Sequence, residues 1–469
     1  MTNVPHPDTP ITNHDIRDGF TFVDLFAGCG GLSLGLRAAG GSELLAVERA
    51  KDAANSLYTN LIASERTFQE HLGLAPEGQI DAGLLADSVE TLLRLGWTPS
   101  RAVDVVVGGP PCQGFSLAGR RDRADARNQL VWRFLDAVSS LDPKVVVIEN
   151  VEGMNQKFSQ TDEPNDVDNR STFAQVLQAL ALTGQGYVTV GIRVNAMHYG
   201  AAQHRPRLMA VGVRHDVAEV LGLQPSTEIW SSHFLPVDSP PVYAPVPTVE
   251  RAYSVSDAIG DLAEIEPEGY SSSYLMALNE AFSGLVRSGQ RGSLENNEHR
   301  NHRARTRTRF SVLQQVEALG GSPRLLGPMS KAHRDEATKQ LLNAVLSADQ
   351  FTFTEGGVDY GAEAFVELVG DLANNKHSQR PLRWGAPART VMTIPDDHIH
   401  PTEPRTFSVR EMARFQGFPD NFVFKGKATT GGQSRRADVP QYSQVGNAVS
   451  PLVARAVGDM LQRILFASS

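Results

Sequence analysis

The stretch Thr21–Gly31 reads TFVDLFAGCGG, and it decides the fold. It begins with a short apolar run that is typical of a buried strand. The glycines that follow allow a tight turn, and Leu32–Ala39 then has the pattern of a helix. A helix after such a turn points its first N–H groups at a ligand, so the stretch predicts a binding turn. Ser33 occupies the third glycine position of the dinucleotide fingerprint, so the turn is of another kind.

The same alternation of predicted strands and helices continues to about residue 215. Short apolar runs indicate strands at Thr21–Phe26, Leu44–Val47, Val103–Val107, Val145–Ile148, Tyr187–Val194 and Leu208–Val213. Helical stretches lie between several of these runs, at Leu32–Ala39, Ala53–Ile62, Gln129–Leu141 and Thr172–Thr183. Such strands and helices in alternation predict a doubly wound α/β fold, with a mostly parallel sheet covered on both faces. No obvious helix separates the last two strands, so we expect an antiparallel pair there.

The alternation fades after residue 215, where prolines, serines and an arginine-rich run replace it, and this change predicts a second, smaller domain. Helical patterns return at Val409–Gln416 and at Pro451–Leu465, and the polar segment Lys157–Ser171 is expected to be a mobile loop. The expected organisation is a flexible leader (1–19), a catalytic and cofactor-binding domain (20–215), a small domain (216–434, with a variable core at about 216–380) and a C-terminal helix that returns to the catalytic domain (435–469).

Composition excludes several classes of protein. The 469 residues contain no apolar run of about 18 residues, so no membrane span is expected. The polar N-terminal segment lacks the apolar core of a secretory signal, which indicates a cytoplasmic protein. Two cysteines, Cys29 and Cys112, are too few for a disulfide scaffold or a cysteine-based zinc site, and we expect no metal.

The net charge of −9 argues against a nucleic-acid partner, but one segment of the chain is locally basic. The run Arg300–Arg309 contains five arginines and His302, with no acidic residue. Screening by salt makes such a local patch matter more than the total charge. The run is therefore either a DNA-binding surface or a solvated loop.

Two acidic residues follow predicted strands near the first turn. Glu48 ends the second strand, and a carboxylate at this place can accept hydrogen bonds from ribose hydroxyls. Asp87 follows the apolar pair Leu84-Leu85, and it either contacts an adenine amine or caps a helix. Together the two carboxylates favour an adenosyl ligand.

A second glycine-rich turn carries a thiol. The strand Val103–Val107 leads into GGPPCQGFS (Gly108–Ser116), with Cys112 at its centre. A free cysteine is often a small buried hydrophobic residue. Burial does not require so rigid a turn, whereas a nucleophile held out toward a ligand does. Cations favour the thiolate form, and three follow closely, namely Arg120, Arg121 and Arg123.

Two further motifs supply a carboxylate and two cations. The strand Val145–Ile148 ends at Glu149, which is followed by Asn150 and Val151. Burial of a carboxylate is costly without a partner, so we expect Glu149 to meet a proton donor or to carry a proton. The segment Gln203–Arg207 (QHRPR) opens the last strand and supplies two fixed cations.

These motifs, in this order, resemble the motif set of bacterial DNA cytosine-5 methyltransferases. The set is DLFAGCGG, GGPPCQGFS, ENV, QHRPR and, near the C-terminus, QVGNAVSP (444–451). The resemblance covers residues 21–213 and about 383–457, and it includes PART (387–390) and REMARFQGFP (410–419). In this family the interval between the two regions holds a small target-recognition domain. The resemblance implies a class I methyltransferase fold, which is Rossmann-like, and methylation at C5 of a cytosine flipped out of duplex DNA.

The resemblance also assigns roles to residues. Cys112 would attack C6 of the cytosine, Glu149 would hold or protonate N3, Arg207 would bind O2, and Arg205 would support the site. S-Adenosylmethionine, which becomes S-adenosylhomocysteine, would be bound by Phe26, Ala27, Gly28, Cys29, Gly30, Gly31, Glu48, Arg49, Asp87, Ser88, Pro110, Leu130, Asn447 and Ala448. Further DNA contacts are expected from Gln113, Ser116, Arg120 and Arg121. The density of positive charge in the run at 300–309, rather than the resemblance, adds Arg300, Arg303, Arg305 and Arg307 to the expected DNA contacts. Arg49 departs from the family pattern, because family members often have an aromatic residue over the adenine at this position.

Two alternatives stay open. One branch of the family performs the same chemistry on tRNA, but that branch carries a short target region, unlike the long interval at 216–380. A catalytically inactive subunit on the same fold is the other alternative, and the intact Cys112, Glu149 and Arg207 argue against it. The expected partners are double-stranded DNA and separate restriction or other defence proteins, and the chain is expected to be monomeric.

Overall fold

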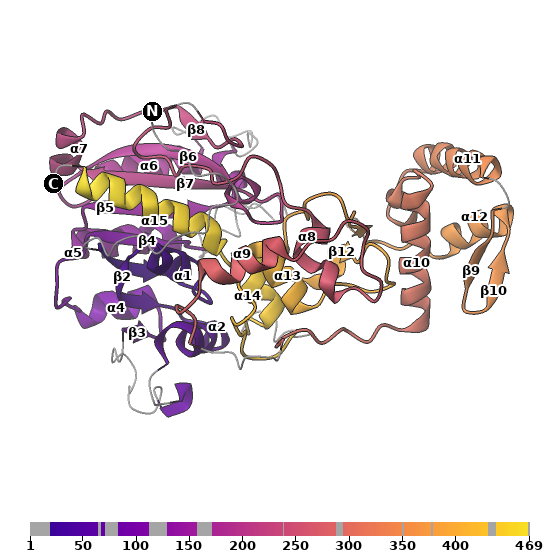
Figure 1. The fold of residues 1–469 in the computed structure, drawn as a ribbon. Coiled ribbons are helices and arrows are strands. Elements are labelled where there is room, and N and C mark those ends of the chain that lie inside the picture. The colour runs from indigo at the N-terminus through magenta and orange to yellow at the C-terminus, as the bar shows by residue number, and fades with distance from the viewer. Residues whose placement is uncertain are drawn as a thin grey trace.

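The computed structural model describes residues 19–63, 67–70, 83–111, 129–156, 171–237, 239–287, 294–348, 351–376, 379–429 and 438–467. The predicted leader, the loop predicted at Lys157–Ser171 (apart from Ser171) and Cys112 with its neighbours to residue 128 lie outside the described residues. A large α/β body and a smaller helical module make up the described chain, and the module projects from the body (Figure 1).

The body is built on one eight-stranded sheet within the described residues, in the order β3-β2-β1-β4-β5-β7-β6-β8. The strands are β1 (Thr21–Leu25), β2 (Ser42–Val47), β3 (Leu84–Leu85), β4 (Val105–Gly108), β5 (Val145–Asn150), β6 (Tyr187–Asn195), β7 (Pro206–Arg214) and β8 (Ile229–Ser231). The strands β1 to β5 run parallel, as predicted. The expected antiparallel pair is β6 with β7, and β7 also runs antiparallel to β5. The sheet continues past residue 215, because β8 pairs with β6.

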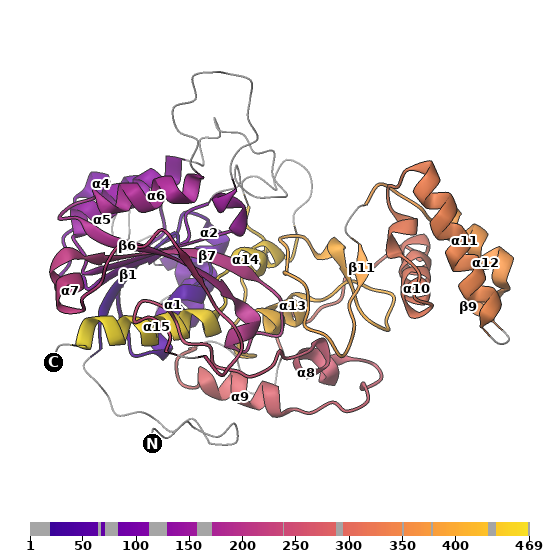
Figure 2. The ribbon, with the colours of Figure 1, turned by 90° about the horizontal axis from the view of Figure 1, so that it is seen from above.

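Helices cover both faces of the sheet (Figure 2). One face is covered by α4 (Val89–Leu95), α5 (Leu130–Leu141) and α6 (Thr172–Ala181). The other face is covered by α1 (Gly31–Ala38), α7 (His215–Val220) and the C-terminal α15 (Pro451–Phe466). The helices α1 and α15 cross closely, since a Cβ on Gly35 would lie 2.4 Å from the Cβ of Ala454. Their contact brings the C-terminus of the chain back to the body.

The helix predicted at Ala53–Ile62 begins two residues earlier and changes form midway. Helix α2 (Lys51–Leu57) continues as a π-helical turn at Tyr58–Ile62. Within this turn Asn60 donates to the carbonyls of Ser56 and Val423, both at 2.7 Å, and accepts from the Val423 N–H at 2.8 Å. A contact with a segment more than 350 residues away therefore accompanies the change, and no local pattern reveals it.

Between sheet and module lie α8 (Val255–Ile259), α9 (Ser273–Ala281), α13 (Val409–Gln416) and α14 (Gln441–Asn447). Their buried side chains share one hydrophobic cluster with α1 and α2. These helices are therefore part of the body, although α8 and α9 fall in the interval for which the sequence predicts a separate domain. Helix α13 has the bounds predicted for it.

The module has a core of its own. It consists of α10 (Ala304–Ala318), α11 (Lys331–Ser347), α12 (Ala362–Asp371) and the hairpin of β9 (Phe353–Glu355) and β10 (Val358–Tyr360). Much of the arginine-rich run thus lies on a helix, whose buried face includes Phe310 and Leu313. A short parallel pair, β11 (Arg380–Pro381) with β12 (His398–Ile399), lies at the base of the module. No helix in this described part of the chain is long and apolar enough to cross a membrane.

Candidate active site

The turn after β1 is shaped to approach a ligand. Gly28 and Gly30 adopt positive φ angles of 58° and 96°, and Gly30 is the N-cap of α1. A Cβ on Gly28 would meet no atom within 4 Å, so this backbone faces open space. A Cβ on Gly31 would lie 2.3 Å from the carbonyl oxygen of Val449, so the turn packs against the segment that contains Asn447 and Ala448. Two predicted cofactor segments, far apart in the chain, therefore meet here.

Glu48, at the end of β2, holds this turn in place. Its two carboxylate oxygens accept hydrogen bonds from the N–H of Gly28 at 2.9 Å and of Ala50 at 2.6 Å. Burial raises the pKa of Glu48, and these amides oppose the rise. Each oxygen keeps a second lone pair, which a ribose hydroxyl can use.

Asp87 and Ser88 follow β3, next to β2 in the sheet. Asp87 accepts a hydrogen bond from the N–H of Ser88 at 2.6 Å, whereas the Ser88 hydroxyl accepts from Thr91 at 3.3 Å and caps α4. The alternative that Asp87 caps this helix is therefore wrong, because Ser88 is the cap. Asp87 is half-buried near the edge at which Glu48 lies.

The remaining predicted cofactor residues differ in exposure. Cys29 lies in the core, where burial raises the pKa of its thiol to about 12. Its side chain is thus a small buried hydrophobic group. Arg49 and Asn447 are exposed, Pro110 and Ala448 are buried, and Phe26 and Leu130 are half-buried.

Glu149 and Arg207 meet at the edge where β5 ends and β7 begins. The Arg207 Nε and a Glu149 carboxylate oxygen are 2.9 Å apart, and both side chains are largely buried, with exposed fractions of 14% and 11%. This ion pair supplies the proton donor expected for Glu149. A Cβ on Gly109 would lie 3.1 Å from the other carboxylate oxygen, so the turn after β4 passes directly beside Glu149.

The turn that leads to Cys112 is also tied to β5. The side chain of Asn150 donates to the carbonyl of Pro110 at 3.3 Å. Pro111 is the last residue described before Cys112, one position away in sequence. The predicted positions Cys112, Gln113, Ser116, Arg120 and Arg121 lie outside the described residues.

Arg205 is buried and binds backbone carbonyls. It donates to Val391 at 3.0 Å, Gly446 at 2.7 Å and Ala448 at 3.1 Å. Burial lowers its pKa well below the ordinary value, and the charge of Arg207 adds to this effect. Arg205 thus connects the start of β7 to the segment that lies against the turn after β1.

A pair of buried glutamines ties the same segments together. Gln203 donates to the side chain of Gln416 and accepts from the N–H of Val391 at 2.9 Å. Gln416 in turn donates to the carbonyls of Val445 at 2.8 Å and Ala448 at 3.1 Å. Sequence reasoning did not single out Val391 or Gln416 as site residues. The only signal was the place of Gln416 inside the motif REMARFQGFP (410–419).

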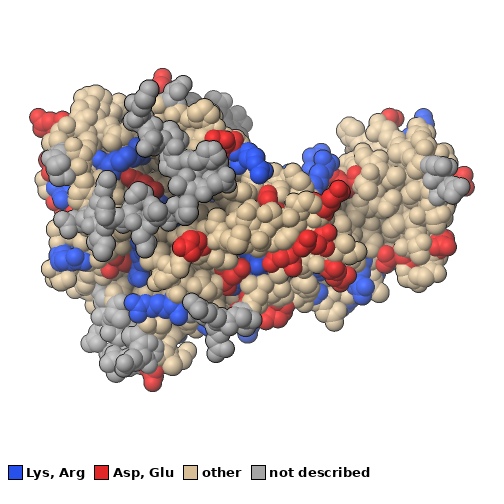
Figure 3. Space-filling view, in the orientation of Figure 1, with Lys and Arg blue, Asp and Glu red and all other residues tan. Residues whose placement is uncertain are grey.

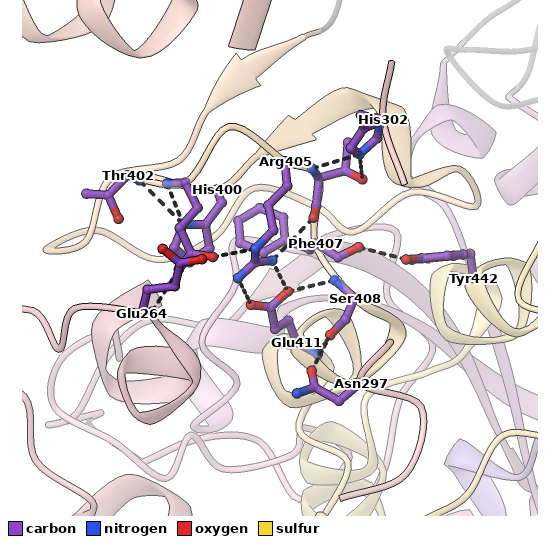
Figure 4. Close-up of polar contacts among 12 residues, drawn as sticks. Glu264, Asn297, His302, His400, Thr402, Arg405, Phe407, Ser408, Glu411 and Tyr442 are labelled. Atoms are coloured by element: carbon purple, nitrogen blue, oxygen red, sulfur yellow. Dashed lines mark hydrogen bonds and ion pairs between the residues drawn. The ribbon is translucent and has the colours of Figure 1, made fainter. Parts of the chain in front are cut away.

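A dense polar network joins the module to the body (Figure 4). Arg405 donates to both carboxylate oxygens of Glu411, at 2.8 and 2.9 Å, and to Glu403 at 2.6 Å. Ser408 and Glu411 form the capping box that begins α13. From α10, Gln314 donates to the carbonyls of His400 at 2.6 Å and Glu403 at 2.8 Å.

The arginines predicted to bind DNA on the run 300–309 are partly engaged within the protein. Arg300 pairs with Asp396, and Arg305 donates to the carbonyl of Asp371 at 2.7 Å. Arg303 and Arg307 are exposed. Arg309 is buried, and it donates to Gln379 at 3.0 Å and to a backbone carbonyl. Arg309 therefore cannot line a DNA path, as the prediction for the whole run required.

Among the described residues, no group of three or more His, Cys, Asp or Glu side chains could hold a metal ion. The arrangement offers a carboxylate and a guanidinium at one sheet edge, beside the turn that leads to Cys112. An open glycine turn with two carboxylates lies along the same sheet edge. Such a site can bind a base by hydrogen bonds and hold a nucleoside beside it.

Comparison with known proteins identifies the family. The model for C-5 cytosine-specific DNA methylases matches residues 20–463. Type II methyltransferase M.AgeI from Thalassovita gelatinovora is 32% identical over 467 residues, which cover 94% of this chain and 98% of that protein. Type II methyltransferase M.DdeI from Desulfomicrobium norvegicum is 28% identical over 443 residues, which cover 94% of this chain and 88% of that protein.

A solved structure shows the same fold. A protein encoded within an E. coli prophage, described as a DNA modification methyltransferase, has a TM-score of 0.55 and 22% identity, and the match covers 96% of this chain and 100% of that one. The predicted fold class and the resemblance drawn from the motifs are thus confirmed. Because the family model matches nearly the whole length, the chain belongs to the C-5 cytosine-specific DNA methylase family.

Proposed function

We propose that the chain transfers a methyl group from S-adenosylmethionine to C5 of a flipped cytosine in duplex DNA, with Cys112 as the covalent nucleophile. The observation that carries the proposal is the Glu149–Arg207 ion pair beside the turn that leads into Cys112. Membership of the family supports the same reaction.

The chemistry requires activation of an unreactive carbon. The Cys112 thiolate forms a bond to C6, and the electron pair of the C5–C6 double bond makes C5 nucleophilic. A proton from Glu149 at N3 and a hydrogen bond from Arg207 to O2 stabilise the charge pushed into the ring. C5 then takes the methyl group, a base removes the C5 proton, and the thiolate leaves C6.

The residues at the first turn fit an adenosyl group. S-Adenosylmethionine, when bound, supplies an electrophilic methyl group. Gly28 leaves open space for close approach of a ligand, and Glu48 retains lone pairs for hydroxyl donors. Asp87 lies at the same edge, where it would reach the adenine amine.

The proposed substrate is a cytosine flipped out of duplex DNA. C5 of a stacked cytosine is inaccessible, so the base must leave the duplex to reach Cys112. We assign target recognition to the module of α10–α12, which lies apart from the sheet. The relatives M.AgeI and M.DdeI are described as type II methyltransferases, which favours a role in a cytoplasmic restriction-modification system or another anti-phage defence.

The test is the Cys112→Ser variant. Transfer of a labelled methyl group should fall to background on duplex DNA, because a serine hydroxyl is almost wholly protonated at neutral pH. Calorimetry with S-adenosylhomocysteine should show unchanged affinity, which would exclude misfolding as the cause. Near-normal methylation by the variant would contradict the covalent mechanism. Faster transfer to tRNA than to duplex DNA by the wild-type protein would contradict the substrate.

A further inference from the structure

A chain of buried polar side chains lies behind the turn that follows β1. The hydroxyl oxygen of Ser33 lies 2.8 Å from Oδ2 of Asp24 and 2.6 Å from Oε1 of Glu43. The three residues belong to α1, β1 and β2, so the chain connects three elements around the turn. Asp24 and Ser33 are fully buried, and the Glu43 side chain is 2% exposed. Most acidic side chains lie on the surface, as the red ones in Figure 3 do, so a fully buried Asp24 requires a physical reason.

The number of hydrogen atoms in this chain is decisive. Both distances are those of hydrogen bonds between oxygen atoms, and each bond requires a hydrogen of its own. A serine hydroxyl supplies one hydrogen, whereas an ionised carboxylate supplies none. If Asp24 and Glu43 were both ionised, one of the two contacts of Ser33 would be a contact between two acceptors. One of the two carboxyl groups therefore carries a proton.

The surroundings of the two carboxyl groups differ. Glu43 is paired with Arg37, whose Nε donates to Oε2 at 3.0 Å and whose Nη2 contacts the same oxygen. Within the described part of the chain, Asp24 has no such counter-charge, and its Oδ1 accepts no hydrogen bond. If Asp24 were ionised, a charged oxygen would be buried without a partner, which is costly. These contacts favour the proton on Asp24.

Electrostatics agrees with the hydrogen count. Burial raises the pKa of Asp24 well above its usual range, and the negative charge of Glu43 adds to the rise. The hydrogen bond with Ser33 opposes the rise, and the charge of Glu48 raises the pKa further. On the other side of β1, the register partner of Asp24 is the apolar Val107 of β4. The described charges that act on Asp24 are thus negative and oppose its ionisation.

The chain acts across the two ends of the turn. Asp24 precedes residues 26–30 and Ser33 follows them, and Phe26 within the turn has a φ of 62°. A residue other than glycine seldom adopts such a φ, so the surrounding structure must hold it there. A hydrogen-bonded link between Asp24 and Ser33 fixes both ends of the turn relative to each other.

The same chain continues to the other side of the turn. Arg37, the partner of Glu43, also donates to the carbonyl of Leu61 at 2.7 Å. A Cβ on Gly30 would lie 3.0 Å from the side chain of Leu61, so this leucine packs directly against the turn. The turn is therefore held from β1, from α1 and from the π-helical turn.

We propose that Asp24 carries a proton at neutral pH and donates a hydrogen bond to Ser33, which donates to Glu43, and that this chain positions the turn for an adenosyl ligand. Asp24 is then a positioning residue, which acts through Ser33. The identity of the ligand rests on the proposed function, whereas the proton on Asp24 does not. Ionisation of Asp24 would remove one of the two hydrogen bonds and add a buried negative charge near Glu48.

The first test detects the proton through its effect on stability. Asp24→Asn replaces the carboxylic acid with a neutral amide and retains a donor for Ser33. Above about pH 4, where an unfolded aspartate is ionised, the folded wild type should bind one proton more than the unfolded chain. Its unfolding equilibrium constant, divided by that of the variant, should therefore rise by up to about tenfold per pH unit between about pH 5 and 8.

Asp104→Asn is the matched control. Asp104 accepts hydrogen bonds from the N–H and the hydroxyl of Thr21 and pairs with Lys144 at 2.9 Å. Burial raises the pKa of Asp104, but these contacts outweigh burial and lower it. Asp104 is therefore ionised in both states, and its ratio should not change over this pH range. An equally flat ratio for Asp24→Asn would overturn the proton on Asp24.

Infrared spectroscopy tests the proton in the wild type itself. If aspartate is labelled with carbon-13 at its side-chain carboxyl group, the band of protonated aspartic acid separates from that of glutamic acid. The wild type should show this band at neutral pH, and Asp24→Asn should lack it. Absence of the band from the wild type would overturn the proposal even if the variant did not fold.

Calorimetry with S-adenosylhomocysteine tests the positioning role. Ser33→Ala breaks the chain between the two carboxyl groups and should weaken binding by about two- to tenfold, the scale of one hydrogen bond. Asp24→Asn keeps the chain and should bind as tightly as the wild type. Wild-type affinity in Ser33→Ala would overturn the positioning role. A wild-type protein that binds no S-adenosylhomocysteine would overturn the proposed function and leave the proton on Asp24 in place.

Discussion

The catalytic edge and the junction with the module both hold buried arginine–glutamate contacts, but they hold them differently. At the catalytic edge Arg207 contacts Glu149 through one nitrogen, and the second carboxylate oxygen faces Gly109. At the junction Arg405 binds Glu411 through two nitrogens and Glu403 through a third. The first arrangement leaves hydrogen-bond donors and acceptors for a substrate. The second uses its donors and acceptors for contacts within the protein. The comparison teaches that the same residue types serve chemistry when incompletely paired and serve rigidity when fully paired.

Electrostatics supports this contrast at the junction. Burial lowers the pKa of Arg405, but its hydrogen bonds with Glu411 and Glu403 outweigh burial, and the pKa is raised. The guanidinium therefore stays charged and firmly bound. A rigid junction keeps the module in one position relative to the active site, which recognition of a DNA sequence requires.

The largest effect is expected when the ion pair between Glu149 and Arg207 is broken. Glu149→Gln should lower kcat by roughly 10²- to 10⁴-fold, because an amide cannot protonate N3. Affinity for S-adenosylhomocysteine should stay at the wild-type level. Glu152→Gln is the matched control, since it removes a more exposed carboxylate paired with Arg193 at 2.9 Å, and it should retain turnover. Single-turnover rates measure both variants, and a wild-type rate for Glu149→Gln would remove this residue from the mechanism.

Breaking the network of Arg405, Glu411 and Glu403 should lower the stability of the protein instead. Glu411→Ala leaves the buried Arg405 without its bidentate partner and should destabilise the protein by about 3–5 kcal/mol. Glu317→Ala removes an acid from the exposed pair with Arg383 and should cost about 0–1 kcal/mol. Urea unfolding followed by circular dichroism compares the two. Equal, small losses would mean that the junction is not rigidified by this network.

The smallest effect concerns pH at the same junction. Burial lowers the pKa of His400 to about 4, and its Nδ1 accepts from the N–H groups of Thr402 at 3.4 Å and Glu403 at 3.1 Å. Between about pH 6.5 and 4 the unfolded chain binds a proton that the folded chain does not, so stability falls as pH falls through this window.

The variant His400→Asn keeps an acceptor for the two amides but cannot be protonated. Its unfolding free energy should therefore depend less steeply on pH between 6.5 and 4, by up to about 1.4 kcal/mol per pH unit. At pH 8 no such difference in slope should remain. Parallel curves for the wild type and the variant over the whole range would show that His400 does not contribute to acid sensitivity.

The sequence predicted the body well because its signals are local. Val145–Ile148 is a continuous apolar run, and such runs form buried parallel strands. Ser408 and Glu411 at the start of α13 form a capping box that can be recognised from their spacing alone. The turns at Gly28 and Pro110 were recognisable from glycine and proline, although the thiol itself lies outside the described residues.

The module and the supports of the site were harder to predict because their signals are not local. Helix α11 has 17 residues, of which only Leu341 and Val345 are buried, so no apolar period marks it. Gln203 and Gln416 meet across 213 positions of sequence, and no spacing rule connects them.

The reversed direction of β7 has a consequence for how Arg205 and Arg207 are placed. A parallel strand delivers its last residue to the chemical edge, whereas β7 delivers its first. Residues two positions apart in an extended strand point to the same face. Arg205 precedes β7, which begins at Pro206, so its side chain does not follow this alternation. Arg207 meets Glu149, whereas Arg205 donates to the carbonyls of Gly446 and Ala448. Because the strand begins between the two arginines, an extension of β7 by one residue toward the N-terminus would turn both guanidinium groups to the same face of the sheet.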